Sequence, residues 1–299
     1  MPSAASGAKV RMRERGGHPP GIRPRGKHRD TVRFMTDNLI FSLSALVALL
    51  PSAFLGWRRD RSRDGIYWVL LAVAVAGPLA WAMAQTSGSW RTGLSTTLWV
   101  TIAVTMAVFA VLAGATRKAW QLTMLLAPYM LIVGILATIW QHAPEKPLGD
   151  APAGWIGVHI AFSVMTYALV TIGAIAALGA FLQERALKAK KPTAMTRLLP
   201  SVADCEILLV RLLIAGESVL ALGLATGMAV QYGETGRLLV FDHKTILTVM
   251  AFAVIGGLLI AHFRSGMRGR KAARLVLLAY LLLTLGYPGV KFVTDVLMS

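Results

Sequence analysis

The sequence WIGVHIAFSVMTYALVTIGAIAALGAFL, residues 155–182, decides the fold class. It contains no Asp, Glu, Lys or Arg, and it shows no strict alternation of polar and apolar residues. A helix of this length is long enough to cross a hydrocarbon layer of ~30 Å. Only helices and closed barrels satisfy every backbone polar group inside lipid, and barrel strands require the alternation that is missing here. The stretch therefore predicts a transmembrane helix.

Similar apolar stretches recur along the chain. Of its 299 residues, 56% are hydrophobic and 15% are charged, and the mean hydropathy is +0.61. A soluble domain carries about 25% charged residues. We predict an all-α, polytopic membrane helical bundle over residues 35–299, with about eight transmembrane helices. The expected spans are 37–56, 66–84, 95–115, 119–141, 155–182, 205–230, 243–262 and 272–297.

Residues 1–34 differ from the rest in composition. They hold nine of the 31 Lys and Arg residues, are rich in Gly and Pro, and contain no apolar run. We predict a basic disordered tail. Because the first apolar stretch is a full-length span, we do not predict a cleaved signal peptide. An alternative is that translation begins at Met35, which would make the tail a mis-assigned start.

The basic residues alternate between the loops. Fifteen Lys and Arg fall in the loops 57–65, 116–118, 183–204 and 263–271, against three in the intervening loops. Such a bias places the basic loops in the cytoplasm and both chain termini outside. A basic tail outside conflicts with this rule, and a start at Met35 would remove the conflict. The net charge of +17 is therefore explained by topology, and we expect no nucleic-acid partner.

Sequence motifs give no catalytic assignment. The chain has no Walker loop, dinucleotide fingerprint, HExxH or nucleophile elbow, and no internal repeat of the kind that many transporters show. Cys205 is the single cysteine, which excludes disulfides within the chain and cysteine metal clusters. Whether the protein is an enzyme stays open, with no motif in favour.

Four histidines belong to the membrane portion, namely His142, His159, His243 and His262. The first three are expected near the outer ends of their helices and His262 near an inner end. His243 and His262 are separated by 19 residues, or ~28 Å along a helix. They cannot bind one metal ion, so an iron site with two histidines should lie on the outer side. His262 would serve a separate, inner site.

His159 begins a polar stripe with Ser163, Thr166 and Tyr167, at helical spacing within an apolar span. Such a stripe should face protein or a cavity, because polar groups at membrane depth are costly. Two interpretations stay open: a hydrogen bond to a neighbouring helix, or a ligand or cofactor role. His262 is likewise either an interfacial histidine or a ligand.

The charged residues in and near the sixth and seventh spans have different expected structural roles. Asp242, just before the seventh span and two residues from Lys244, is expected to cap that helix. Glu206, Arg211 and Glu217 in the sixth span do not share one helical face. Glu217 should either pair with another helix or line a wet cavity.

Taken in order, motifs of the C-terminal half resemble the cytochrome c assembly family. The closest branch is the HemX/YpjD-like membrane proteins, relatives of the haem-handling CcsA type, and the resemblance covers about residues 150–297. The residues that carry it are His159, Tyr167, Pro200-Ser201, Gly216, Gly227, Asp242-x-Lys244, His262-x-Arg264, Gly266-Met267-Arg268-Gly269-Arg270-Lys271-Ala272-Ala273 and Tyr287-Pro288-Gly289-Val290.

This resemblance implies that haem is the cofactor. It makes His159 the outer axial ligand and His262 the ligand near the inner side, with Asp242 and Lys244 closing an outer loop. The chain departs from the family pattern, since residues 231–242 contain no Trp and no histidine follows the last span. His243 or His142 could supply a second outer ligand. The candidate cofactor-binding residues are His159, His262, His243, Asp242, Lys244 and Tyr167, with His159 and His262 as iron ligands.

The sequence thus favours a haem-binding protein of the bacterial inner membrane that assists cytochrome c assembly or haem supply. Its expected partners are haem, the lipid bilayer, and cytochrome c assembly proteins or apocytochrome. One alternative is a membrane scaffold or regulator of a respiratory or haem pathway that lacks haem. Another is a small-molecule permease that uses Glu217 and Arg211 in a central cavity.

Overall fold

The structure is a computed structural model, and it describes residues 26–54, 63–86, 91–141, 146–147, 153–237, 242–267 and 269–297. The chain divides into two units, Met1–Asn38 and Leu39–Ser299. Of the first unit, the described part is the beginning of helix α1 (Gly26–Phe54). All contacts reported below lie within the second unit.

The described residues are almost entirely helical. Seven helices are long and apolar enough to cross a membrane, and the apolar part of α1, Leu39–Phe54, is a shorter eighth. This confirms the predicted helical membrane bundle. The long helices after α1 are α2 (Gly65–Thr86), α3 (Leu94–Ala115), α4 (Thr123–Ile139), α5 (Ala153–Lys188), α6 (Val202–Thr235), α7 (His243–Ser265) and α8 (Gly269–Thr284).

Short elements complete the chain. The 3₁₀ turns η2 (Ala119–Leu122) and η3 (Thr196–Leu198) lie in two of the connections, and strands β1 (Arg91–Thr92) and β2 (Lys146–Pro147) form one antiparallel pair. After α8 come the π-helical segment η4 (Leu285–Gly289), α9 (Val290–Phe292) and the π-helical segment η5 (Val293–Leu297).

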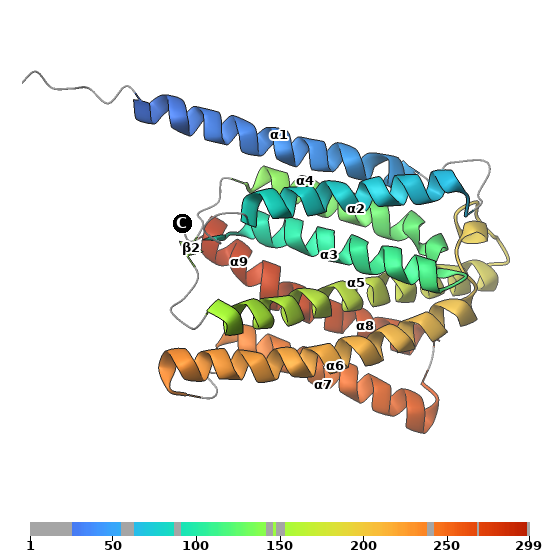
Figure 1. The fold of residues 1–299 in the computed structure, drawn as a ribbon. Coiled ribbons are helices and arrows are strands. Elements are labelled where there is room, and N and C mark those ends of the chain that lie inside the picture. The colour runs from blue at the N-terminus through green and yellow to red at the C-terminus, as the bar shows by residue number, and fades with distance from the viewer. Residues whose placement is uncertain are drawn as a thin grey trace, which may run out of the picture. The chain divides into compact units, whose positions relative to one another are not determined.

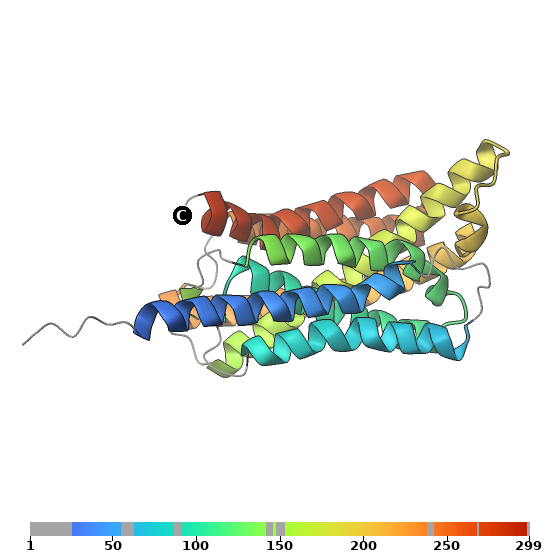
Figure 2. The same cartoon turned by 90° about the horizontal axis from the view of Figure 1, so that it is seen from above.

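Successive helices run in opposite directions, as Figures 1 and 2 show. The connections after α3, α5 and α7 therefore gather at one end of the bundle, and the C-terminal segment reaches the other end. Those three connections are basic loops in the sequence. The structure thus brings basic loops to the same end, as an alternating topology requires.

Helix α5 lies at the centre of the bundle, where it packs against α3, α6 and α8 (Figure 1). Its contact with α6 runs along much of both helices and depends on small residues. A Cβ placed on Gly216 of α6 would lie 3.3 Å from Val170 Cγ2, and one on Gly173 of α5 would lie 3.8 Å from Leu212 Cβ. Lipid is as apolar as the side chains, so close approach of backbones at small residues drives such packing.

The predicted boundary of the N-terminal tail at residue 34 falls inside helix α1. Helix α1 begins at Gly26 and therefore includes residues 26–34 of the segment that we assigned to the tail. The segment from Lys27 to Phe34 contains no Gly or Pro and continues a helix that the apolar residues already nucleate, which makes each added turn inexpensive. Residues 1–25 lie outside the described residues.

The last predicted span, 272–297, is not a single α-helix. Its first part is α8, and from Leu285 the hydrogen bonding changes to the wider π-helical pattern. Pro288 lies inside that segment and has no N–H to donate, so it removes one α-helical hydrogen bond. The π-turn accommodates the proline without ending the span.

Candidate functional site

His159 lies in the second turn of α5 and points to α6. Its Nδ1 atom is 3.0 Å from the carbonyl oxygen of Gly223 and 3.4 Å from Oγ1 of Thr226. A carbonyl oxygen only accepts, so Nδ1 carries the proton and donates it. The second ring nitrogen, Nε2, then keeps its lone pair. Within the described part of the chain, Nε2 has no hydrogen-bond partner.

The sequence of α6 makes room for this ring. Gly223 and Gly227 are four residues apart and lie on the same helical face, as in small-xxx-small packing motifs. A Cβ on Gly227 would lie 2.9 Å from Cε1 and 3.2 Å from Nδ1 of His159. Thr226 Oγ1 donates back to Leu222 O at 2.9 Å, which holds its side chain beside the ring. The imidazole is therefore seated against the α6 backbone.

His262 is held in a similar way at the other end of the bundle. It lies in the last turn of α7, and its Nδ1 is 3.0 Å from the carbonyl oxygen of Met267. The chain turns back there because Gly266 adopts φ +65°, and its N–H bonds to the carbonyl of His262 at 3.0 Å. Nδ1 is again the donor, and Nε2 again has no partner among the residues that the structure describes.

Asp242 caps α7, as predicted. Its Oδ1 accepts from the backbone N–H of Thr245 at 2.8 Å. Partial burial raises the pKa of Asp242, but the hydrogen bonds from Thr245 and the positive charges of Lys244 and His243 outweigh it and lower the pKa. The carboxylate form is thus favoured in the folded protein.

We therefore expect the stability of the protein to fall in acid through Asp242. A lowered pKa contributes stability above the unfolded value of about 3.9, and this is lost as the pH falls through the folded value. Asp242→Ala should cost about 1 kcal/mol at neutral pH, measured by thermal unfolding in detergent between pH 7 and pH 3. Asp242→Asn is the control, because an amide caps well but does not titrate. Equal acid sensitivity in Asp242→Asn and wild type would contradict this role.

The outer histidines are not brought together. His243 and Lys244 are exposed at the start of α7, and in the described part of the chain neither is hydrogen-bonded to His159. His142 lies outside the described residues. His159 and His262 lie near opposite ends of the bundle, as predicted, so one iron atom cannot bind both. The structure assigns no second outer ligand.

The predicted polar stripe of α5 divides between two neighbours. Tyr167 faces α8, where its hydroxyl is 3.1 Å from Tyr280 Oη and 3.1 Å from Thr284 Oγ1. Tyr129 of α4 hydrogen-bonds Tyr280 in turn. Eight helical residues advance the direction of a side chain by roughly 80° beyond two full turns, which separates Tyr167 from His159. Tyr129 and Tyr280 were missed in the sequence, although a tyrosine within an apolar span signals a hydrogen-bond partner.

Glutamates of α6 contact different neighbours. Glu206 Oε1 accepts from the backbone N–H of Gly269 at 2.9 Å, which fixes the start of α8 within the motif Gly266–Lys271. Glu217 faces α7, where its Oε1 would lie 3.0 Å from a Cβ on Gly256. Its Oε2 is buried without a hydrogen-bond partner in the described structure. Glu217 therefore packs against another helix, and no oppositely charged side chain pairs with it among the described residues.

The donor chemistry fits haem better than a bare metal ion. No three His, Cys, Asp or Glu side chains gather among the described residues. A haem needs only one or two axial ligands from the protein, because the porphyrin supplies four nitrogens. Two separate histidines, each with a free Nε2, suit that requirement.

Comparison with known proteins identifies the family to which the chain belongs. The sequence profile described as "Cytochrome C assembly protein" matches residues 66–298. The chain belongs to the cytochrome c assembly protein family. The match begins within α2, so family membership extends to α2–α4 as well as to residues 150–297, where the motifs lie.

Two relatives of this cytochrome c assembly family member are informative. A 28.8 kDa protein in the nifR3-like 5′ region of Azospirillum brasilense, described as uncharacterized, is 56% identical over 271 residues, covering 89% of this chain and 100% of that protein. The inner membrane protein YpjD of Escherichia coli K12 is 27% identical over 188 residues, covering 62% of this chain and 69% of YpjD. No solved structure matches.

Proposed function

We propose that this protein binds haem in the bacterial inner membrane and assists cytochrome c assembly or haem supply. His159 would bind haem iron at the outer end of the bundle, and His262 would bind it at the end that carries the basic loops. The observation that carries the proposal is shared by both residues. Each donates Nδ1–H to a backbone carbonyl at 3.0 Å.

That hydrogen bond prepares a histidine for iron. It fixes the ring's orientation and the neutral tautomer, and it makes the other nitrogen a better donor. A histidine that served only to join two helices would need the Nδ1 contact alone. Both interpretations of His159 are therefore compatible, since the helix contact uses one nitrogen and leaves the other for a ligand.

The surroundings of both histidines suit a flat apolar ligand. Trp155, one helical turn before His159, is 54% exposed. Phe263, which packs edge-on against the ring of His262 at 5.3 Å between centroids, is 67% exposed. Exposed aromatic side chains beside each imidazole would cover part of a porphyrin face.

The remaining candidate residues have supporting roles in this proposal. His243 and Lys244 are exposed at the same end as His159, where positive charge would favour the carboxylates of haem. Asp242 fixes the start of α7 and so positions both. Tyr167 joins α5 to α8, which stabilises the helix that presents His159. Membership of the family and the name of the inner membrane relative YpjD support the location.

A hemin titration tests the proposal. The full-length protein, purified in detergent, is mixed with hemin, passed over a desalting column and analysed by reduced-minus-oxidised absorption spectra. We expect a sharp reduced haem spectrum in wild type and near-complete loss in the double variant His159→Ala, His262→Ala. His28→Ala, which removes a histidine before the apolar part of α1, is the matched control. Absence of haem from wild type would refute the proposal and leave the scaffold or permease interpretation.

A further inference from the structure

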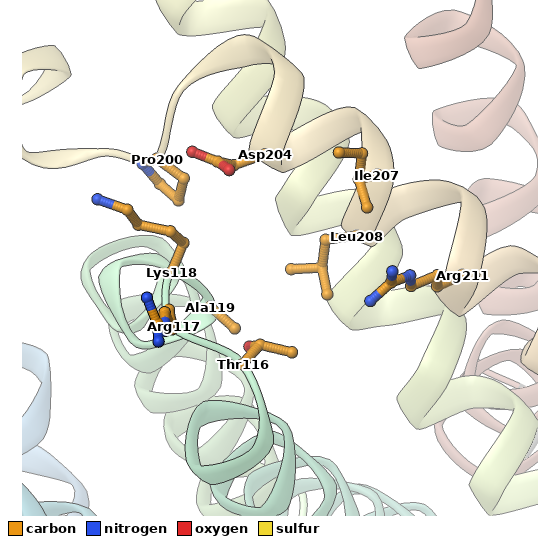
Figure 3. Close-up of a pocket in the computed structure, with 9 residues that line it drawn as sticks. All are labelled: Thr116, Arg117, Lys118, Ala119, Pro200, Asp204, Ile207, Leu208 and Arg211. Atoms are coloured by element: carbon orange, nitrogen blue, oxygen red, sulfur yellow. The ribbon is translucent and has the colours of Figure 1, made fainter.

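A cavity of about 170 Å³ lies at the end of the bundle that carries the basic loops (Figure 3). One wall is the turn between α3 and α4, and the other is the first part of α6. A single water needs roughly 10–15 Å³ on this scale, so the cavity accommodates a much larger group. Three cations line it, Arg117, Lys118 and Arg211.

The positive charge of this cavity is only partly offset by the protein. No hydrogen bond or ion pair involves the three cationic side chains in the part of the chain that the structure describes. The single carboxylate in the lining, Asp204, accepts a hydrogen bond from Ser201 Oγ at 2.7 Å, and its one negative charge stands against three positive charges. In Figure 3 the guanidinium of Arg211 extends from α6 toward the turn that carries Arg117 and Lys118. A lining with three cations and one carboxylate favours an anionic ligand.

The wall beside the cations is apolar and faces outward. Ile207 lines the cavity, and Ile207, Arg211 and Ile214 share one face of α6 at spacings of four and seven residues. Ile207 is 55% exposed and Ile214 is 42% exposed. This apolar surface would not stabilise a bound phosphate ion, whereas an acyl chain could be buried along it.

The expected depth of Arg211 in the membrane is close to that of the lipid phosphate groups. Helix α6 has 34 residues and is ~51 Å long, about 20 Å more than the hydrocarbon layer. If the excess is shared between both ends, the first ~10 Å of α6 lie outside the hydrocarbon. Arg211 is nine residues beyond Val202, or ~14 Å along the helix. It therefore lies near the boundary where lipid phosphates meet the acyl chains.

The cavity is also a built feature of the fold. Gln183 Nε2 donates to the carbonyl oxygens of Thr196 at 2.6 Å and of Leu199 and Pro200 at 3.1 Å each. These bonds hold the connection that leads into α6 and fix Pro200 in the lining. We propose that the cavity binds the phosphate of an anionic phospholipid, with an acyl chain along Ile207 and Ile214. This site is independent of haem.

Lipid titration tests the inference. The full-length protein in detergent is titrated with phosphatidylglycerol, phosphatidylcholine or sodium phosphate at matched ionic strength, and bound lipid is counted by native mass spectrometry. We expect phosphatidylglycerol to bind in preference to phosphatidylcholine. Because each cation near a lipid surface contributes about fivefold, Arg117→Gln with Arg211→Gln should weaken phosphatidylglycerol binding roughly thirtyfold.

Two controls make the result specific. Arg185→Gln removes the same charge from an exposed residue at the same end of the bundle, outside the cavity, and should change binding less than twofold. Arg211→Lys keeps the charge and should retain most of the affinity, which separates charge from misfolding. Equal losses in Arg185→Gln and Arg211→Gln would overturn the site. Binding of sodium phosphate as tight as that of phosphatidylglycerol would overturn the lipid as its ligand.

Discussion

His159→Gly is expected to abolish haem binding at the outer end of the bundle and to be rescued by free imidazole. The substitution removes the proposed iron ligand and leaves a cavity of imidazole shape beside Gly223 and Gly227. Loss of an outer-shell partner of a metal ligand costs roughly 10–100-fold in affinity, so loss of the ligand itself should cost more. The measurement is hemin affinity from absorption titration, with and without imidazole in the buffer.

Rescue distinguishes a ligand from a structural histidine. Imidazole that enters the cavity would restore the reduced spectrum, whereas it would not repair a misfolded bundle. The same titration on His262→Ala should retain the outer spectrum, because His262 lies near the other end. If His159→Gly binds hemin as tightly as wild type, His159 is not the ligand and its role is the contact with α6.

Gly227→Ala is the second substitution with a large expected effect. An added Cβ would lie 2.9 Å from Cε1 of His159, closer than side chains tolerate, so the ring must leave its hydrogen bond to Gly223. Overpacking costs about 1–3 kcal/mol and the lost hydrogen bond about 1 kcal/mol. The variant should therefore be about 2–4 kcal/mol less stable than a comparable Gly→Ala change without a clash, measured by thermal unfolding in detergent.

Gly233→Ala is the comparable substitution that creates no clash. Gly233 lies in the same helix with nothing within 4 Å of an added Cβ, so the substitution should be neutral or stabilising by up to ~1 kcal/mol. Combining Gly227→Ala with His159→Ala should remove most of the penalty, because the clash needs both side chains. Additive effects of the two substitutions would mean that the ring does not occupy the position next to Gly227.

The sequence by itself was sufficient for the fold class. Apolar stretches long enough to cross a membrane, interrupted by basic loops, are local properties of the chain, and lipid permits few other structures for them. The capping role of Asp242 could also be predicted, since a cap acts within three residues. Boundaries were less certain at the ends, where Gly26 begins α1 and Pro288 changes the last span.

Tertiary structure decided how the polar residues are used. Periodicity places His159 and Tyr167 roughly 80° apart around α5, and the packing of α6 and α8 against that helix decides which partner each one meets. The free Nε2 of His159 depends on a carbonyl 64 residues away in the chain. The cavity at Arg211 likewise joins α6 to the distant turn between α3 and α4. Such contacts depend on which helices become neighbours, and that choice is made by close packing at small residues such as Gly216 and Gly227 rather than by any local pattern.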